Sequence, residues 1–175
     1  MKALLVLFFV ALPAFGQGQP SVTAVAPGCG PAKAEFGVTT GQDANPASQP
    51  GDGKALIYFL QDDAEFDSRP RPTVRFGLDG AWAGATHSNS YFYVSVDPGE
   101  HHLCASWQGT VALGPSRRDA ALQFAAEAGK TYYFRANDVY NRGRVIAAVV
   151  FKPLDPDEGQ LLMNKFSYST SHPKN

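Results

Sequence analysis

The chain has 175 residues, 44% of them hydrophobic, and its 15 basic and 16 acidic side chains give a formal net charge of −1. This length fits one domain of ordinary size with a substantial core. The basic residues are scattered along the sequence, which excludes the clustered basic face that is typical of nucleic-acid-binding proteins, so we expect no nucleic-acid partner.

The first residues predict export. Residues 1–16 combine Lys2, an apolar run over residues 3–12, the helix-breaking Pro13 and small residues up to Gly16. This is the pattern of a secretory signal peptide. The apolar run is shorter than the roughly 20 residues of a membrane-spanning helix. We therefore expect cleavage near Gly16, a secreted or periplasmic mature protein and no transmembrane segment.

Composition then separates an arm from a β-domain. Residues 17–53 are rich in Gly, Pro, Gln, Ala and Ser without sustained periodicity, which predicts an irregular N-terminal arm. Residues 54–175 are predicted to form a β-domain, because short apolar and aromatic runs alternate with turn signals. The stretch DPDEGQLLMNKF has the acidic residues and proline of a helix start, so one short C-terminal helix is expected before a frayed tail. The predicted strands cover residues 54–61, 73–78, 81–86, 90–96, 101–107, 120–127, 130–137 and 144–154.

Two turn signals indicate how these strands connect. Asp79-Gly80 is a two-residue hairpin signal, and Asp97-Pro98-Gly99-Glu100 has proline and glycine at the positions that a tight turn favours. Strands joined this closely are expected to be antiparallel. About eight such strands predict an all-β fold, an antiparallel β-sandwich, with a closed barrel-like sheet as the alternative.

The two cysteines predict a disulfide. An exported chain with an even number of cysteines usually pairs them, and Cys29 with Cys104 is the one pairing available. The bond would fasten the arm to the middle of a strand. The alternative is a reactive thiolate at Cys104 beside His102, which shares its strand face.

The adjacent histidines His101 and His102 look at first like a site, but neighbouring side chains on a strand point to opposite faces. No further Cys or His stands at ligand spacing, so we predict no metal and no cofactor. We expect His101 to hydrogen-bond a loop carbonyl beside the turn. Without a nucleophile elbow, a zinc-binding helix or a phosphate loop, we predict no catalytic residue. The enzymatic alternative is a small exported hydrolase or metal-assisted enzyme that uses His87, His101, His102 and Asp97.

Aromatic side chains suggest a binding role. Tyr91 and Tyr93 share one face of their strand, and a sandwich core explains most aromatic residues of this kind. An exposed row would instead bind an envelope protein, a peptide or a glycan, with Trp82 or Trp107 as an anchor. The candidate binding surface consists of Trp82, His87, Tyr91, Tyr93, His101 and His102.

Three segments carry a family resemblance: GKALIYFLQD, VRFGLDGAWAGATHSNSYFYVSVDPGEHHLCASW and AEAGKTYYFRA. Over residues 53–154 the chain resembles a bacterial family of exported proteins and lipoproteins that share a β-domain of unknown function. The Asp-Gly hairpin, the Pro-Gly-x-His turn and the Ala-Gly-Lys-x-Tyr-Tyr pattern carry the resemblance. It implies a non-enzymatic β-domain with a binding or structural role in the envelope. No cysteine stands at the cleavage junction, so the resemblance does not extend to a lipid anchor.

Overall fold

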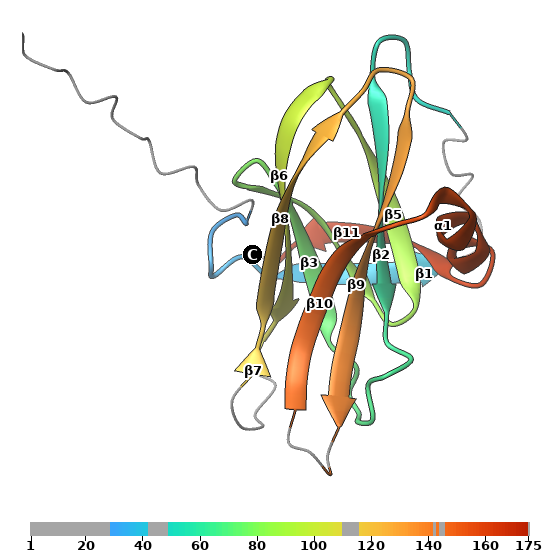
Figure 1. Ribbon diagram of the computed structural model, residues 1–175. Coiled ribbons are helices and arrows are strands. Elements are labelled where there is room, and N and C mark those ends of the chain that lie inside the picture. Colours follow the sequence, from blue (N-terminus) through green and yellow to red (C-terminus); the bar gives the residue numbers. More distant parts are fainter. Residues whose placement is uncertain (1–28, 42–48, 110–115, 142, 144–145, 175) are drawn as a thin grey trace, which may run out of the picture.

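Two β-sheets and one short helix make up the structure (Figure 1). The computed structural model describes residues 29–41, 49–109, 116–141, 143 and 146–174. The predicted signal peptide over residues 1–16 and two parts of the predicted arm, residues 17–28 and 42–48, lie outside the described residues. The larger sheet has the strand order β1-β11-β5-β2-β9-β10-β7, and the smaller one has the order β4-β3-β6-β8. The predicted all-β, sandwich-like fold is confirmed.

All eight predicted strands and the C-terminal helix are present, and three further strands, β1, β7 and β11, occur among the described residues. The elements are β1 (Phe36–Gly41), β2 (Ala55–Asp62), β3 (Thr73–Leu78), β4 (Ala81–His87), β5 (Ser90–Val96), β6 (Gly99–Gln108), β7 (Ser116–Arg117), β8 (Asp119–Ala126), β9 (Thr131–Asn141), β10 (Ile146–Leu154), α1 (Pro156–Met163) and β11 (Ser167–Pro173). The helix begins as its sequence predicts, because the side chain of Asp155 caps it by accepting from the Asp157 backbone N–H at 2.9 Å. No helix within the described ranges is long and apolar enough to cross a membrane.

The connections between strands differ in part from the predicted ones. Asp79 and Gly80, with φ values of 52° and 85°, form the predicted hairpin turn between β3 and β4. The turn after Val96, however, joins β5 of the larger sheet to β6 of the smaller sheet, so these two strands do not pair. The chain returns to the edge of the larger sheet with the short strand β7 and to its centre with β9, which lies parallel to β2. The prediction of a purely antiparallel sandwich was therefore wrong for the larger sheet, which is mixed.

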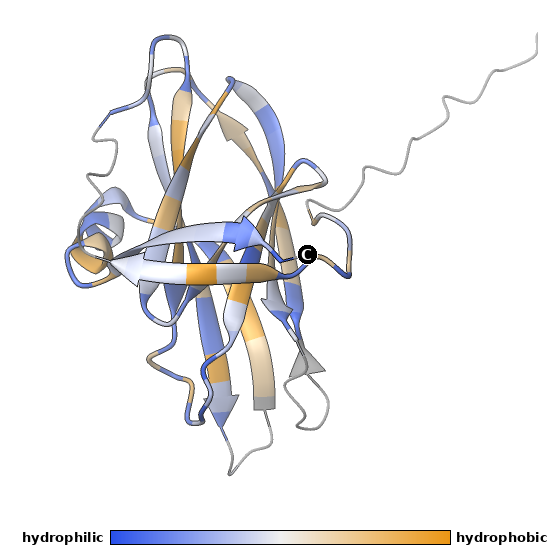
Figure 2. Cartoon of the chain, turned by 180° about the vertical axis from the view of Figure 1, so that it is seen from behind, coloured by the Kyte–Doolittle hydropathy of each residue, from blue (hydrophilic) through white to orange (hydrophobic). Residues whose placement is uncertain are grey.

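Strands β1 and β11 correct two further expectations, an irregular arm and a frayed tail. They pair antiparallel with each other from Phe36 opposite Pro173 to Gly41 opposite Tyr168. The pair lies across the other strands at the side of the sandwich where β4 and β5 lie, as Figure 2 shows. Ser171 accepts a hydrogen bond from the Ala85 backbone N–H at 2.9 Å, which ties β11 to β4. Neither strand has a sustained apolar alternation, and pairing with the other strand stabilises each of them.

The core between the sheets is largely aromatic. The ring centroids of Phe59 in the larger sheet and Phe76 in the smaller sheet are 5.0 Å apart. Strand β2 is buried on both faces, because one face packs against the smaller sheet and the other against a cluster of tyrosines. Trp107 is 1% exposed and contacts Phe66 edge to face at 5.8 Å. The suggestion that Trp107 anchors a surface was therefore wrong, since its strand face points into the core.

A buried polar network crosses this core. Asp138 on β9 accepts hydrogen bonds from Trp107 Nε1 at 2.5 Å and from Gln61 Nε2 at 2.6 Å. Gln61 in turn accepts from Thr86 Oγ1 at 2.7 Å. Burial raises the pKa of the Asp138 carboxyl to about 7, although the two hydrogen bonds act in the opposite direction. The network links β2 and β9 of the larger sheet to β4 and β6 of the smaller one.

The outer face of the larger sheet is covered by α1 and by aromatic side chains. Tyr58 and Tyr133 are buried and stacked at 5.2 Å between ring centroids. Helix α1 approaches Tyr133 so closely that a Cβ on Gly159 would lie 2.3 Å from its Cγ. The helix can take this position because Gly159 has no side chain.

Candidate functional site

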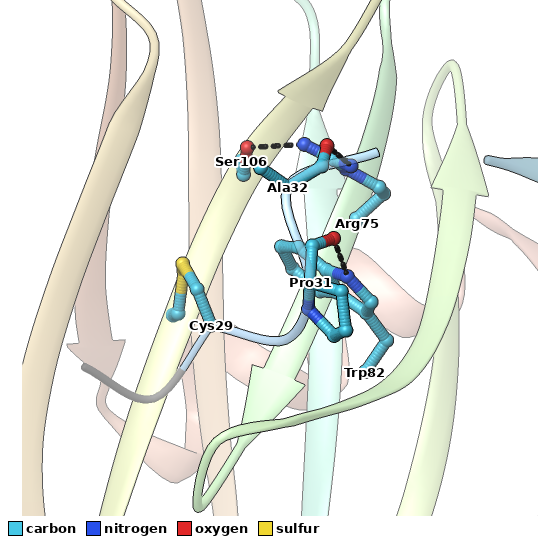
Figure 3. Close-up of a disulfide and its surroundings, with 7 residues drawn as sticks. Cys29, Pro31, Ala32, Arg75, Trp82 and Ser106 are labelled. Atoms are coloured by element: carbon cyan, nitrogen blue, oxygen red, sulfur yellow. Dashed lines mark hydrogen bonds between the residues drawn. A yellow bond between two sulfur atoms is a disulfide. The ribbon is translucent and has the colours of Figure 1, made fainter. Parts of the chain in front are cut away.

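The predicted disulfide between Cys29 and Cys104 is present, with 5.1 Å between the two Cα atoms. Cys104 lies in the middle of β6 and is fully buried. Its side chain points to the outer face of the smaller sheet, where the residues that follow Cys29 lie across it (Figure 3). A bonded Cys104 has no thiolate, so the nucleophile alternative is not supported.

The described part of the arm is held on the sheet through its backbone. Trp82 Nε1 donates to the carbonyl oxygen of Pro31 at 2.8 Å. Arg75 Nη1 donates to the carbonyl oxygens of Ala32 and Ala34 at 2.9 Å and 2.6 Å. Figure 3 shows both side chains rising from the sheet toward the arm. We call these residues, with the disulfide, the arm clamp; its three hydrogen bonds do not depend on the arm's side chains.

Arg75 is the most unusual member of the clamp, because it is 8% exposed and charged. Its Nη2 donates to Ser106 Oγ at 2.9 Å, and its guanidinium lies 4.4 Å from the ring centre of Trp82. Its Nε is buried without a hydrogen-bond partner, and no carboxylate of the described residues forms an ion pair with it. Burial is the main cause that lowers the pKa of this guanidinium.

A pocket of about 580 Å³ lies between the arm and the smaller sheet. Ala32, Ala34 and Trp82 contribute apolar surface to it. Arg118, just before β8, also lines the pocket; its Nε is buried without a partner, and its Nη2 lies 3.5 Å from the Trp107 carbonyl. The charged residues around the pocket are Lys33, Glu35, Arg75, Arg118 and Asp119. Three of them are cationic and two are anionic.

His101 lies elsewhere, at the end of the sandwich where the two predicted turns meet. Its Nε2 is 2.8 Å from the carbonyl oxygen of Asp97, which confirms the predicted bond to a loop carbonyl, and its Nδ1 is 2.7 Å from Asp79 Oδ2. Burial disfavours the charged imidazole, but these two hydrogen bonds outweigh it and raise the pKa of His101. Asp97 also pairs with Lys54 at 2.7 Å. His101 therefore links the turn at Asp79 to the turn at Asp97, which is a structural role.

The remaining candidate residues are not brought together. His87 lies 3.3 Å from Thr73 Oγ1, at the end of the β3–β4 hairpin opposite to Asp79. Trp82 and His102 share the outer face of the smaller sheet, whereas Tyr91 and Tyr93 lie on the outer face of the larger one. The four residues of the enzymatic alternative, His87, His101, His102 and Asp97, therefore do not converge. Within the described ranges, no three His, Cys, Asp or Glu side chains are arranged to hold a metal ion.

Sequence reasoning missed Arg75 and Arg118, the two arginines of the pocket. A signal was available for Arg75, because it is the one charged residue in the strand TVRFGL, between Val74 and Phe76. A charge in an apolar strand needs partners, and here the arm supplies them. Arg118 stands next to Arg117 in the sequence SRRD, so the sequence offers nothing that distinguishes it from a solvated pair.

A family model described as "Protein of unknown function (DUF2846)" matches residues 51–148, which is more than half of the chain. No curated protein and no solved structure matches the chain. The matched segment includes Cys104 and the sheet residues that line the pocket, among them Arg75, Trp82 and Arg118. Cys29 and the arm residues that line the pocket lie before it.

Proposed function

This chain belongs to the DUF2846 family of proteins of unknown function, and we propose that it is a secreted, non-catalytic β-sandwich module with a binding or structural role in the bacterial cell envelope. The observation that carries the proposal is the pocket under the arm. Hydrogen-bond donors and an aromatic ring surround it, an arrangement that recognises a ligand.

Two features support the proposed compartment. Residues 1–16 have the composition of a signal peptide. The bond between Cys29 and Cys104 is of a kind that persists in oxidising compartments such as the periplasm and the exterior of the cell. The proposed division is a signal peptide over residues 1–16, an arm over residues 17–53 that contains β1, and the β-domain over residues 54–175.

The proposed partner is an envelope protein, a peptide or a glycan that approaches the outer face of the smaller sheet. Trp82 and His102 of the candidate binding surface share this face with the pocket. A contact there would extend from the pocket along β3 and β6. His87, Tyr91, Tyr93 and His101 belong to other parts of the surface and would require a second contact.

Cell fractionation tests the compartment. The tagged full chain is produced in a bacterium beside Leu7→Arg, which places a charge in the apolar run of the proposed signal peptide. We expect the unmodified chain in the periplasmic or extracellular fraction with no cysteine open to alkylation without reductant. We expect Leu7→Arg to stay in the cytoplasm with two reactive cysteines. Recovery of the unmodified chain from the cytoplasm with two labels would contradict the proposal.

An activity screen tests the absence of catalysis. The purified exported protein is incubated with ester, phosphoester, peptide and glycoside substrates, beside the variants His101→Ala and His87→Ala. We expect no turnover above the buffer rate for any of the three proteins. Turnover that either variant abolishes would instead support the enzymatic alternative, because those histidines are its proposed acid–base groups.

A further inference from the structure

We propose that the pocket under the arm binds a small organic acid with one carboxylate on an apolar body, and that Arg75, Arg118 and Ser106 hold the carboxylate. This inference assigns a ligand class to the binding role proposed above and rests on it to that extent. It depends on three observations: a buried cation that no described ion pair includes, a second cation that the arm clamp does not use, and the apolar wall beside them.

Arg75 supplies the first observation. All its described hydrogen-bond partners are neutral: the carbonyls of Ala32 and Ala34 and the hydroxyl of Ser106. A buried charge without an opposite charge is costly, because neutral dipoles replace only part of its hydration. Asp119 and Glu35 favour the charged form of Arg75 without forming an ion pair with it. A carboxylate in the adjoining pocket would supply the direct ion pair. Its second oxygen would be in reach of Ser106, whose hydroxyl accepts from Arg75 and can still donate its own proton.

The second observation is Arg118, which lines the pocket but makes none of the hydrogen bonds of the arm clamp. Its one described hydrogen bond is the 3.5 Å contact to the Trp107 carbonyl, and its buried Nε has no partner. The planar guanidinium matches a carboxylate with two parallel hydrogen bonds. Lys33 lines the same pocket, and none of the five described ion pairs includes it. Two guanidinium groups and one ammonium group therefore surround one cavity.

The walls and the volume indicate the rest of the ligand. Ala32, Ala34 and Trp82 offer apolar surface, and about 580 Å³ is within the size range of small-molecule sites. Glu35 and Asp119 also line the pocket. Their negative charges disfavour a ligand with several anionic groups, because like charges within one pocket repel each other. The combination selects a single carboxylate attached to an apolar body.

The test uses the purified, disulfide-bonded protein with benzoate and hexanoate as probes. Benzamide and hexanamide are the controls, since each has the body of its acid without the charge. The signals of the arginine Nε–H groups in ¹⁵N-resolved NMR spectra report on the two unpartnered atoms directly. We expect both acids to shift the Arg75 and Arg118 signals saturably. We expect the amides to bind at least about tenfold more weakly, the effect of losing a charge-assisted hydrogen bond.

Three substitutions place the binding in this pocket. Arg118→Gln should weaken benzoate binding about tenfold and leave the arm clamp intact. Lys130→Gln is the matched control, because it removes one positive charge from an exposed residue outside the pocket, and it should bind as the unmodified protein does. Glu35→Gln should strengthen binding, since it removes a repelling carboxylate. Thermal unfolding of each variant verifies the fold.

Several results would overturn the inference: no saturable shift with either acid, equal binding of acids and amides, or equal binding by Arg118→Gln and Lys130→Gln. Weaker binding by Glu35→Gln would also contradict it. These outcomes are independent of the fractionation experiment. A protein that is exported but ignores both acids keeps its proposed role and loses this ligand class. A cytoplasmic protein that binds the acids keeps the ligand class and loses the envelope role.

Discussion

The outer faces of the two sheets are both covered, but by different means. On the smaller sheet the cover is an extended arm, held by one disulfide and by hydrogen bonds from Arg75 and Trp82 to backbone carbonyls. On the larger sheet the cover is helix α1, packed on a cluster of tyrosines around Tyr58 and Tyr133. Directional polar contacts hold a segment at a few points and leave a pocket between them. Apolar packing fills the space, so a single added methyl group has no room at Gly159.

The largest effect should come from the interior on which both covers rest. The pKa of Asp138 is raised from 3.8 to about 7, so the folded state binds its proton more tightly than the unfolded state does. Its contribution to stability is fully present below about pH 4 and is lost as the pH rises through about 7. The difference corresponds to about 4 kcal/mol.

Urea unfolding of the unmodified protein and of Asp138→Asn, from pH 4 to pH 8, measures this contribution. We expect the stability of the unmodified protein relative to the variant to decrease over that range. Asp79 and Asp97, whose pKa values are lowered, titrate alike in both proteins and cancel in the comparison. Parallel stability curves would show that the Asp138 carboxyl has no raised pKa in the folded state.

The second effect concerns the cover of the smaller sheet alone. Cys29→Ala combined with Cys104→Ala should lower the free energy of unfolding by about 3 kcal/mol, because the unfolded chain gains conformational entropy. The arm should also become accessible to protease at Lys33. Urea unfolding and limited proteolysis measure both effects, and fragments from α1 should not appear at the same protease concentration. An unchanged urea midpoint would mean that the hydrogen bonds of the clamp hold the arm without the disulfide.

The third effect concerns the cover of the larger sheet. Gly159→Ala should destabilise the protein by about 2 kcal/mol, because the new Cβ overlaps the ring of Tyr133. Without the contact to Tyr133, the same substitution would stabilise the helix, because alanine favours a helix over glycine by about 1 kcal/mol. The sign of the change therefore tests the contact. Gly51→Ala is the control, with no atom within 4 Å of the added Cβ, and should be nearly neutral. A stabilised Gly159→Ala protein would mean that α1 does not pack closely on the tyrosines.

The smallest effect should come from His101, which touches neither cover. Its pKa is raised above 6.5, so its contribution to stability is present below pH 6.5 and is lost as the pH rises through the folded-state value. The side chain is partly exposed, and solvent reduces the effect to less than about 1 kcal/mol. Urea unfolding of His101→Ala at pH 6 and pH 9 measures it. A loss that is larger at pH 9 than at pH 6 would contradict the assigned hydrogen bonds.

The parts of the fold that could be predicted are those encoded by local patterns. Alternation placed Tyr91 and Tyr93 on one face, Asp79-Gly80 gave a hairpin, and the cysteine count gave the disulfide. Strands β1 and β11 could not be found this way, because FGVTTG and SYSTSHP lack a sustained apolar alternation and are stabilised by pairing with each other across the length of the chain. The same holds for the crossing between sheets after Val96, which a tight turn does not reveal.

The candidate site was predicted least well, for a related reason. The sequence pointed to the histidines as candidate site residues, and strand alternation correctly predicted that His101 and His102 point to opposite faces. The proposed site depends instead on Arg75 and Arg118, which are far apart in the sequence and line one pocket under the arm. Arg75 could have been noticed as a charge in an apolar strand, whereas Arg118 has the appearance of a surface residue. Their joint role follows from burial and from missing partners, which no linear pattern records.

The disulfide also decides how a mechanical force would travel through the molecule. A pull on the chain before Cys29 passes through the bond to Cys104 on β6, which is flanked by β3 and β8 in the smaller sheet. It therefore bypasses β1. A pull on the other end reaches β11 directly, at the point where Pro173 faces Phe36, and would open the β1–β11 pair one rung at a time. A covalent bond thus carries tension from the N-terminal side into the sheet, whereas strand pairing carries it from the C-terminal side.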